Sequence, residues 1–179
     1  DTQKTLESLV RVSEEIRTKS SELFLDTYNK IRRNFHNMFR RLFNGGRGEL
    51  RLVDPTNVLT SGIEIIVHPP GKIVVHLEAL SGGEKALVAI ALYFAIMKVN
   101  PAPFCVMDEI EAALDEVNVD RFAQYLRVMN EKTQFILITH RRGTMEEADV
   151  LYGVTMQDKG ISKLLSLRAS EVAEKLNMN

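Results

Sequence analysis

Two short stretches contain residue types that could bind a phosphate group and act on it. The first is Ser81-Gly82-Gly83-Glu84, which stands directly before an apolar run. Ser-x-x-Glu is a capping box, and many helices begin this way without any further role. The two adjacent glycines are poor helix formers, however, and they leave backbone N–H groups uncovered at the helix N-terminus. Together with the Ser81 hydroxyl and the helix dipole, they predict an anion site that suits a phosphate.

The second stretch places two carboxylates after four apolar residues. Residues 104–107 predict a buried strand, and Asp108 and Glu109 follow at its carboxyl end, where sites in α/β proteins lie. Asp108 could hold Mg²⁺ through water, and Glu109 could polarise an attacking water. Capping of the following turn is a fair alternative for these two acids taken alone.

Two further residues belong to the same constellation. Asp115 closes the run Ala113-Leu114-Asp115 shortly after the acidic pair, and the next predicted strand ends in Thr139-His140. A histidine at a strand end is more often a surface residue than a catalytic one. His140 nevertheless follows the strand that comes next after the Asp-Glu strand, so the two strand ends can lie side by side.

A long helix precedes these residues. From about residue 5 to residue 43 the sequence has neither proline nor glycine, and apolar residues recur at spacings of three and four. A single helix of about 39 residues, or about 58 Å, is predicted. It is either an amphipathic helix that covers a core or a coiled-coil arm whose last turns are buried, and its length favours the arm. The predicted domains are an arm over residues 1–43 and a lobe over residues 44–179.

The lobe is predicted to combine a small antiparallel sheet with an α/β layer. Three strands separated by turn residues, at 49–53, 62–67 and 73–77, predict the antiparallel sheet. From residue 80 onward, alternating helices and strands predict a parallel sheet. These are helix 84–99, strand 104–107, helix 118–129, strand 134–139, helix 143–148, a hairpin of 150–156 and 161–167, and a last helix over 169–176.

Composition limits the function classes only loosely. The chain has 179 residues, 45% of them hydrophobic, with one cysteine and a formal net charge of −1. No apolar run approaches the roughly 20 residues that span a bilayer, so no membrane partner is expected and the cytoplasm is the expected compartment. Between residues 30 and 51 one acid accompanies a group of basic residues, which are Lys30, Arg32, Arg33, Arg40, Arg41, Arg47 and Arg51. This group could contact DNA, although a solvated helix face is the favoured interpretation.

The order of these motifs resembles that of the ATP-binding-cassette ATPases. Leu-Ser-Gly-Gly-Glu, the strand with Asp-Glu, Leu-Asp and the strand ending in histidine resemble their signature motif, Walker B, D-loop and switch histidine. Residues 80–87, 103–115 and 139–141 resemble the structural maintenance of chromosomes (SMC) family in particular. Residues 43–46, the Pro-Pro-Gly turn and residues 143–149 further resemble its bacterial members. The resemblance covers about residues 30 to 167.

The resemblance implies a role for each candidate residue, with ATP and Mg²⁺ as cofactors. Ser81, Gly82 and Gly83 would contact the γ-phosphate of a nucleotide bound on a second head, with Glu84 in the same loop. Asp108 would support Mg²⁺, Glu109 would be the general base, Asp115 would lie at the dimer seam beside the nucleotide, and His140 would sense the γ-phosphate in catalysis.

The sequence contains no G-x-x-x-x-G-K-[ST] phosphate-binding loop. In the SMC resemblance that loop belongs to an N-terminal lobe, so the chain is expected to be the C-terminal lobe of an ABC-type ATPase head, excised from a longer protein and inactive alone. The implied partners are the N-terminal lobe, a second SMC head, a kleisin subunit and DNA. The implied function is ATP-dependent head engagement in chromosome condensation and segregation, at the nucleoid.

Two other interpretations remain open. A coiled-coil DNA-repair ATPase would have the same head, although the Pro-Pro-Gly turn and the run Thr-His-Arg-Arg-Gly-Thr-Met argue against it. A non-catalytic coiled-coil interaction module would use Ser81 and Glu109 only as caps.

Overall fold

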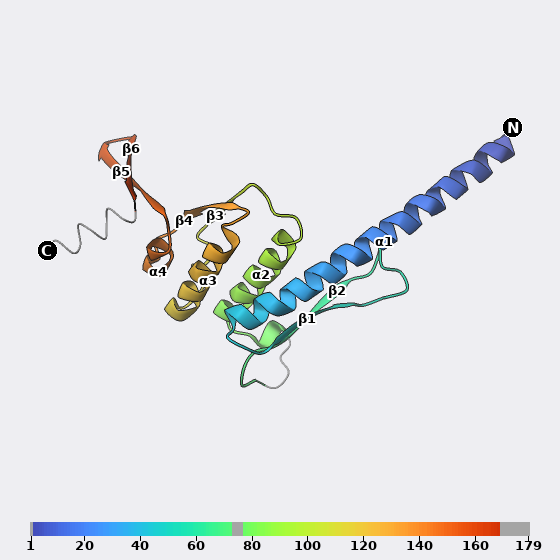
Figure 1. Ribbon diagram of the computed structural model, residues 1–179, viewed down its shortest axis with the longest axis horizontal. Coiled ribbons are helices and arrows are strands. Elements are labelled where there is room, and N and C mark those ends of the chain that lie inside the picture. The colour runs from blue at the N-terminus through green and yellow to red at the C-terminus, as the bar shows by residue number, and fades with distance from the viewer. Residues whose placement is uncertain (1, 73–76, 169–179) are drawn as a thin grey trace. The chain divides into compact units, whose positions relative to one another are not determined.

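The computed structural model describes residues 2–72 and 77–168, and the chain divides into two compact units, Asp1–Ala102 and Pro103–Asn179. The first unit contains α1 (Thr2–Leu42), β1 (Arg47–Leu52), β2 (Ile63–His68), the 3-10 helix η1 (Leu77–Ala79) and α2 (Gly82–Met97) (Figure 1). The second contains β3 (Phe104–Asp108), α3 (Glu116–Met129), β4 (Gln134–Ile138), α4 (Arg142–Glu146), β5 (Val150–Asp158) and β6 (Ile161–Arg168). The predicted boundary between residues 43 and 44 is a different division, and it stays a prediction.

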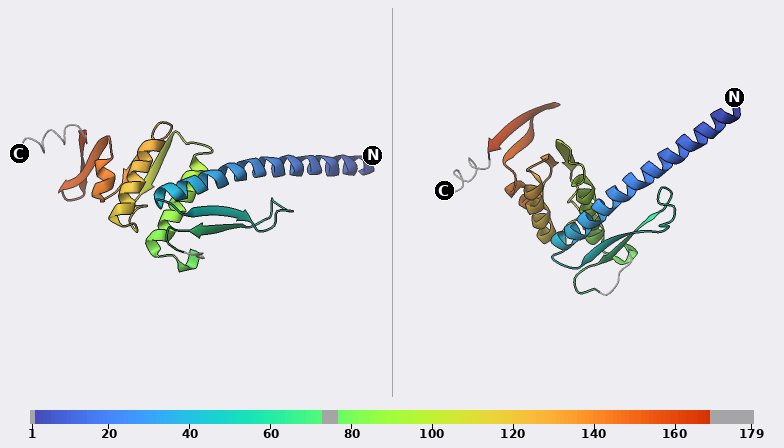
Figure 2. Two further views of the ribbon diagram at one scale, coloured as in Figure 1. Left: turned by 60° about the horizontal axis from the view of Figure 1, so that its bottom comes forward. Right: turned by 45° about the vertical axis from the view of Figure 1, so that its right-hand side comes forward.

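Helix α1 changes character along its length. Its first turns are exposed, with Leu9 at 62% and Ile16 at 60%, whereas Phe35 and Phe39 near its end are completely buried. In every view its N-terminal end lies beyond the other elements of the first unit (Figures 1 and 2). The helix ends before Asn44, whose φ of 55° lies in the left-handed region common at helix C-termini. The predicted burial of its last turns is therefore confirmed.

The buried end of α1 packs against α2 and β1. Tyr28 Oη donates to the carbonyl of Leu50 at 2.8 Å, and Asn34 Nδ2 donates to the carbonyl of Ala95 at 3.2 Å. Gly48 in β1 lies so close to the helix that a Cβ there would be 2.8 Å from the Phe39 side chain. These contacts fix the first unit around the aromatic end of α1.

The antiparallel sheet has two strands within the described residues. Strand β1 pairs with β2 in a register that places Arg47 opposite His68 and Leu52 opposite Ile63. The third predicted strand covered residues 73–77. Residues 73–76 lie outside the described residues, and Leu77 belongs to the 3-10 helix η1, so the prediction is wrong for that residue.

The second unit is built on a parallel pair of strands. Strand β3 pairs with β4 so that Asp108 lies opposite Ile138, and α3 forms the crossover that a parallel pair requires. Cys105 and Met107 are buried, but Phe104 and Val106 are 58% and 56% exposed. The predicted buried strand is therefore buried on one face only, because no element of the second unit covers the other face within the described residues. Strands β5 and β6 form the predicted antiparallel hairpin.

The other predicted helices and strands are found with ends that shift by a few residues, and the predicted helix at 169–176 lies outside the described residues. In the part of the chain that the structure describes, no helix has the length and apolar character needed to cross a membrane.

Candidate functional site

The Ser81 loop opens helix α2 in the first unit. Ser81 is the N-cap residue, its hydroxyl oxygen accepts from the Glu84 backbone N–H at 3.2 Å, and Glu84 Oε2 accepts from the Ser81 N–H at 2.9 Å. The predicted capping box is therefore confirmed. A Cβ added at Gly82 would meet nothing within 4 Å, so packing in this chain gives no reason for a glycine there.

Glu84 fastens the loop to the preceding segment. Its Oε1 accepts from Lys72 Nζ at 2.7 Å, and its Oε2 is taken by the Ser81 N–H. The hydrogen bond from Lys72 and, to a smaller extent, that from Ser81 lower the pKa of Glu84 below its ordinary value. Both carboxylate oxygens thus have protein partners, and nucleotide contact by Glu84 stays a prediction.

In the second unit, the acidic pair lies at the carboxyl end of β3. Asp108 is the last residue of the strand, and Glu109 follows with a φ of 47°, a left-handed conformation that is uncommon for a non-glycine residue. The Glu109 N–H donates to the carbonyl of Ile138 at 2.9 Å, which fastens the turn to the end of β4. The predicted neighbourhood of the two strand ends is confirmed.

The structure brings Glu109 and His140 into contact. His140 Nδ1 lies 3.1 Å from Glu109 Oε1, and the two side chains are 64% and 52% exposed. A carboxylate and an imidazole at this distance can share a proton or orient one another, and their exposure leaves them accessible to a ligand.

Asp115 lies at the end of the same turn and caps α3. Its carboxylate accepts from the Asn118 N–H at 2.9 Å and from Asn118 Nδ2 at 3.0 Å. These contacts explain an aspartate at this position without a ligand, so its place at a dimer seam stays a prediction.

For Mg²⁺, Asp108 has the right chemistry but little help from its neighbours. Among the described residues there is no group of three or more histidine, cysteine, aspartate or glutamate side chains that could hold a metal ion. Mg²⁺ is usually bound through one or two carboxylates together with waters and substrate phosphates. Asp108, an exposed carboxylate at a strand end, fits that mode.

Four residues to which the sequence analysis gave no role support this site. Glu111 is buried, and it accepts hydrogen bonds from the hydroxyls of Thr139 and Thr144. Arg141 Nη2 donates to the carbonyls of Ala112 and Leu114. The available signal was a lone acid within the apolar run Ile110 to Leu114, but a glutamate ordinarily indicates exposure.

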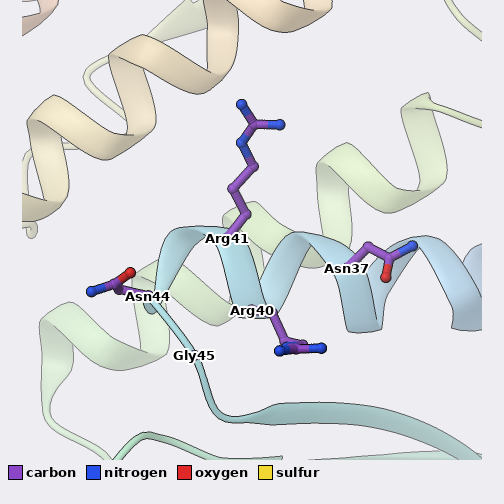
Figure 3. A pocket seen from close by; sticks show the side chains of 5 residues that line it. All are labelled: Asn37, Arg40, Arg41, Asn44 and Gly45. Carbon is purple, nitrogen blue, oxygen red and sulfur yellow. The ribbon is translucent and has the colours of Figure 1, made fainter.

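The basic group at the end of α1 is partly neutralised. Lys30 pairs with Asp26 at 2.6 Å, Arg47 with Glu49 at 2.9 Å and Arg51 with Glu64 at 2.6 Å. Asn37, Arg40, Arg41, Asn44 and Gly45 line an open depression, and Figure 3 shows Arg40 and Arg41 leaving the helix in different directions. Three of the seven basic residues are thus paired with acids, and DNA contact by this group stays a prediction.

Comparison with known proteins identifies the family. The family model described as RecF/RecN/SMC N terminal domain matches residues 3–163. The Chromosome partition protein Smc of Bacillus subtilis (strain 168) is 59% identical over 167 residues, which cover 93% of this chain and 14% of that protein. That of Desulfitobacterium hafniense (strain Y51) is 54% identical over 168 residues, covering 94% of this chain and 14% of that protein. The chain thus spans about one seventh of the length of these relatives.

Solved structures show the same fold. The Smc head domain of Pyrococcus furiosus, with an extended coiled coil and bound to the C-terminal domain of ScpA, superimposes with a TM-score of 0.84 at 42% identity. It covers 96% of this chain, which in turn covers 43% of that one. A chain solved in work on ATP-driven dimerization and DNA stimulated activation of SMC ATPases has a TM-score of 0.78 at 42% identity, with 88% of this chain and 96% of that one covered. The chain therefore belongs to the SMC family and has the ABC-type ATPase fold of SMC head domains.

Proposed function

We propose that this chain is the C-terminal lobe of an SMC head and contributes two different parts of a composite ATP site. The observation that carries the proposal is the contact between Glu109 and His140 at the ends of adjacent parallel strands, in an SMC-family chain without a phosphate-binding loop. The family model's description refers to an N terminal domain. The C-terminal assignment rests instead on the missing phosphate-binding loop, and we propose that the other half of the site lies on another segment.

One feature of the fold supports the proposal of an incomplete head. Phe104 and Val106 on β3, with Ile136 and Ile138 on β4, leave an apolar face of a parallel sheet about half exposed. Parallel sheets ordinarily have both faces covered, so the N-terminal lobe is the expected cover.

ATP would supply the phosphoanhydride bond that is cleaved, and Mg²⁺ would supply the positive charge that neutralises its phosphates. Glu109 is proposed to accept the proton of the attacking water, and His140, in contact with Glu109 Oε1, to orient that carboxylate and meet the γ-phosphate. Asp108 is proposed to hold Mg²⁺ through water. The N–H groups that open α2, with the Ser81 hydroxyl, are proposed to bind the γ-phosphate on a second head, beside Asp115 at the seam.

In the complete protein, ATP binding would join two heads and hydrolysis would separate them. The exposed turns of α1 would belong to the coiled-coil arm that leads into the head. Because the arm is joined to the head, the ATP cycle would change the conformation of the protein on DNA during chromosome condensation and segregation. A kleisin subunit is the proposed further partner, since an Smc head has been solved bound to ScpA. The cytoplasm, at the nucleoid, is the proposed location.

The test restores the N-terminal lobe by co-expression and measures ATP hydrolysis and head dimerisation on a sizing column. Glu109→Gln removes the proposed base and should lower turnover by about 10²–10⁴-fold while ATP-bound dimers accumulate. Ser81→Arg should abolish those dimers, because its side chain fills the phosphate position. Appreciable hydrolysis by the isolated chain, or normal dimerisation of Ser81→Arg, would contradict the proposal.

One observation favours the non-catalytic module as a second candidate. Ser81 and Asp115 both have complete capping roles within the chain. The same assay separates the two functions, because a module without nucleotide chemistry shows no ATP-dependent dimer when the second lobe is added.

A further inference from the structure

Glu111 is a buried carboxylate that the proposed chemistry does not use. It is 2% exposed, and its Oε1 accepts hydrogen bonds from two hydroxyls, Thr139 Oγ1 and, at 3.2 Å, Thr144 Oγ1. Burying a carboxylate costs free energy even when it is hydrogen-bonded, and an apolar side chain of similar volume often packs as well or better. Core stability alone therefore does not explain a glutamate here.

The two threonines connect Glu111 to the segment that carries His140. Thr139 directly precedes the histidine, and its hydroxyl also accepts from the backbone N–H of Arg141 at 3.0 Å. Thr144 is a buried residue of α4. One carboxylate oxygen thus fixes the backbone on both sides of His140.

Arg141 makes the reverse connection. Its Nη2 donates to the carbonyls of Ala112 at 2.8 Å and Leu114 at 3.1 Å, in the turn between Glu109 and Asp115. Its Nε is buried and has no hydrogen-bond partner within the described residues. Leaving a buried donor unpaired costs free energy, so the other contacts of Arg141 must hold its side chain in place. Glu111, in the turn after Glu109, therefore bonds to side chains on either side of His140. Arg141, next to His140, bonds to the backbone of that same turn.

The Glu109–His140 contact needs such support. Both side chains are more than half exposed, and an exposed contact between two polar side chains contributes little to its own geometry. The left-handed backbone of Glu109 is a conformation that persists only where the surrounding structure imposes it.

We propose that Glu111 and Arg141 are positioning residues that hold Glu109 and His140 in the arrangement required for hydrolysis. This inference rests on the proposed function, because it presumes that Glu109 is the base. It assigns the buried hydrogen bonds to the catalytic step and not to nucleotide binding or head engagement. Displacing a catalytic group by about 1 Å can cost about 10²-fold in rate.

The test uses the complete SMC protein that contains this chain. Glu111→Leu keeps most of the volume and removes the acceptor, so kcat for ATP should fall at least about tenfold while KM and ATP-dependent dimerisation stay as in the unchanged protein. Glu111→Gln is the matched control. Its amide oxygen can accept from both hydroxyls, and kcat should stay within about threefold.

A second pair of variants leaves Glu111 and Arg141 in place. This pair tests the positioning role if Glu111→Leu does not fold. Thr144→Val removes one hydroxyl with almost no change in volume and should lower kcat by about three- to tenfold, whereas Thr144→Ser should restore it. Unchanged kcat in Glu111→Leu and Thr144→Val overturns the inference. So does a loss of dimerisation and thermal stability in parallel with kcat, which indicates a merely structural role.

Failure of the proposed function gives a different result. In that case the unchanged protein does not hydrolyse ATP, or Glu109→Gln does not accumulate ATP-bound dimers. If both of those controls behave as expected, the Glu111 and Thr144 variants test the positioning role alone.

Discussion

At the scale of single residues, the Ser81 hydroxyl can serve both its observed cap and the proposed phosphate contact. The capping box uses a lone pair of the Ser81 oxygen, which accepts from the Glu84 N–H. A hydroxyl has one donor and two acceptor positions, so its hydrogen remains available to an anion. Gly82 beside it has open space where a side chain would stand. The cap and the proposed phosphate contact are therefore compatible.

A pair of substitutions at Ser81 separates these two roles. Ser81→Asp keeps a good N-cap, so the free energy of unfolding should change by less than about 0.5 kcal/mol, but its charge should repel phosphate and abolish ATP-dependent dimers. Ser81→Ala removes the cap and should cost about 1 kcal/mol, with partial loss of dimers. Urea unfolding and sizing chromatography measure the two effects. Normal dimerisation of Ser81→Asp would leave Ser81 with a capping role only.

At the scale of elements, the close approach of β1 to α1 organises the first unit. Phe39 of α1 stacks on Phe43 with ring centroids 4.1 Å apart, and Gly48 of β1 lies directly against the Phe39 side chain. No larger residue fits between the strand and the helix without movement of the backbone or the ring.

Gly48→Ala should therefore destabilise the chain by about 1–3 kcal/mol, because overpacking forces the strand away from the helix. Gly82→Ala is the matched control for stability, since its new methyl group meets open space and alanine is the better helix former. Urea denaturation of both variants gives the comparison. Equal midpoints for Gly48→Ala and the unchanged chain would show that the strand can shift freely.

Local patterns predicted the elements but not all of their surroundings. The three- and four-residue spacing predicted α1 and its buried end, and the apolar runs ending in Asp108 and Thr139 predicted two strands whose ends meet. The exposed face of β3 was missed because four consecutive apolar residues hide the alternation of the strand. Glu111 was missed because its partners, Thr139 and Thr144, are distant in sequence, and no local rule predicts a buried carboxylate.

At the scale of the whole molecule, apolar surface is left exposed in the second unit. Besides the face of β3 and β4, the hairpin of β5 and β6 exposes large apolar side chains, among them Tyr152, Val154, Met156, Ile161 and Leu164. Extended apolar patches of this kind mark interaction surfaces. The chain spans 14% of the length of its Bacillus subtilis relative, and these surfaces are where the proposed N-terminal lobe and other partners would bind.

A charge on the exposed sheet face tests its proposed cover. Val106→Glu should leave the free energy of unfolding of the chain nearly unchanged, since this side chain is 56% exposed, but should weaken association with the N-terminal lobe at least about tenfold. Val117→Glu, at a position 60% exposed on α3, is the control and should associate normally. Co-purification of the two lobes measures the difference. Equal recovery with both variants would place the lobe elsewhere.

The length of helix α1 and its burial at one end together have a mechanical consequence. Its 41 residues form one helix without a break, with the inner turns held in the core around Phe35 and Phe39 and the outer turns exposed. At 1.5 Å per residue such a helix is about 60 Å long, so a tilt of about 10° at the inner end displaces the outer end by about 10 Å. The helix is in effect a lever. Any small rotation of the core that holds it would become a large displacement at its far tip.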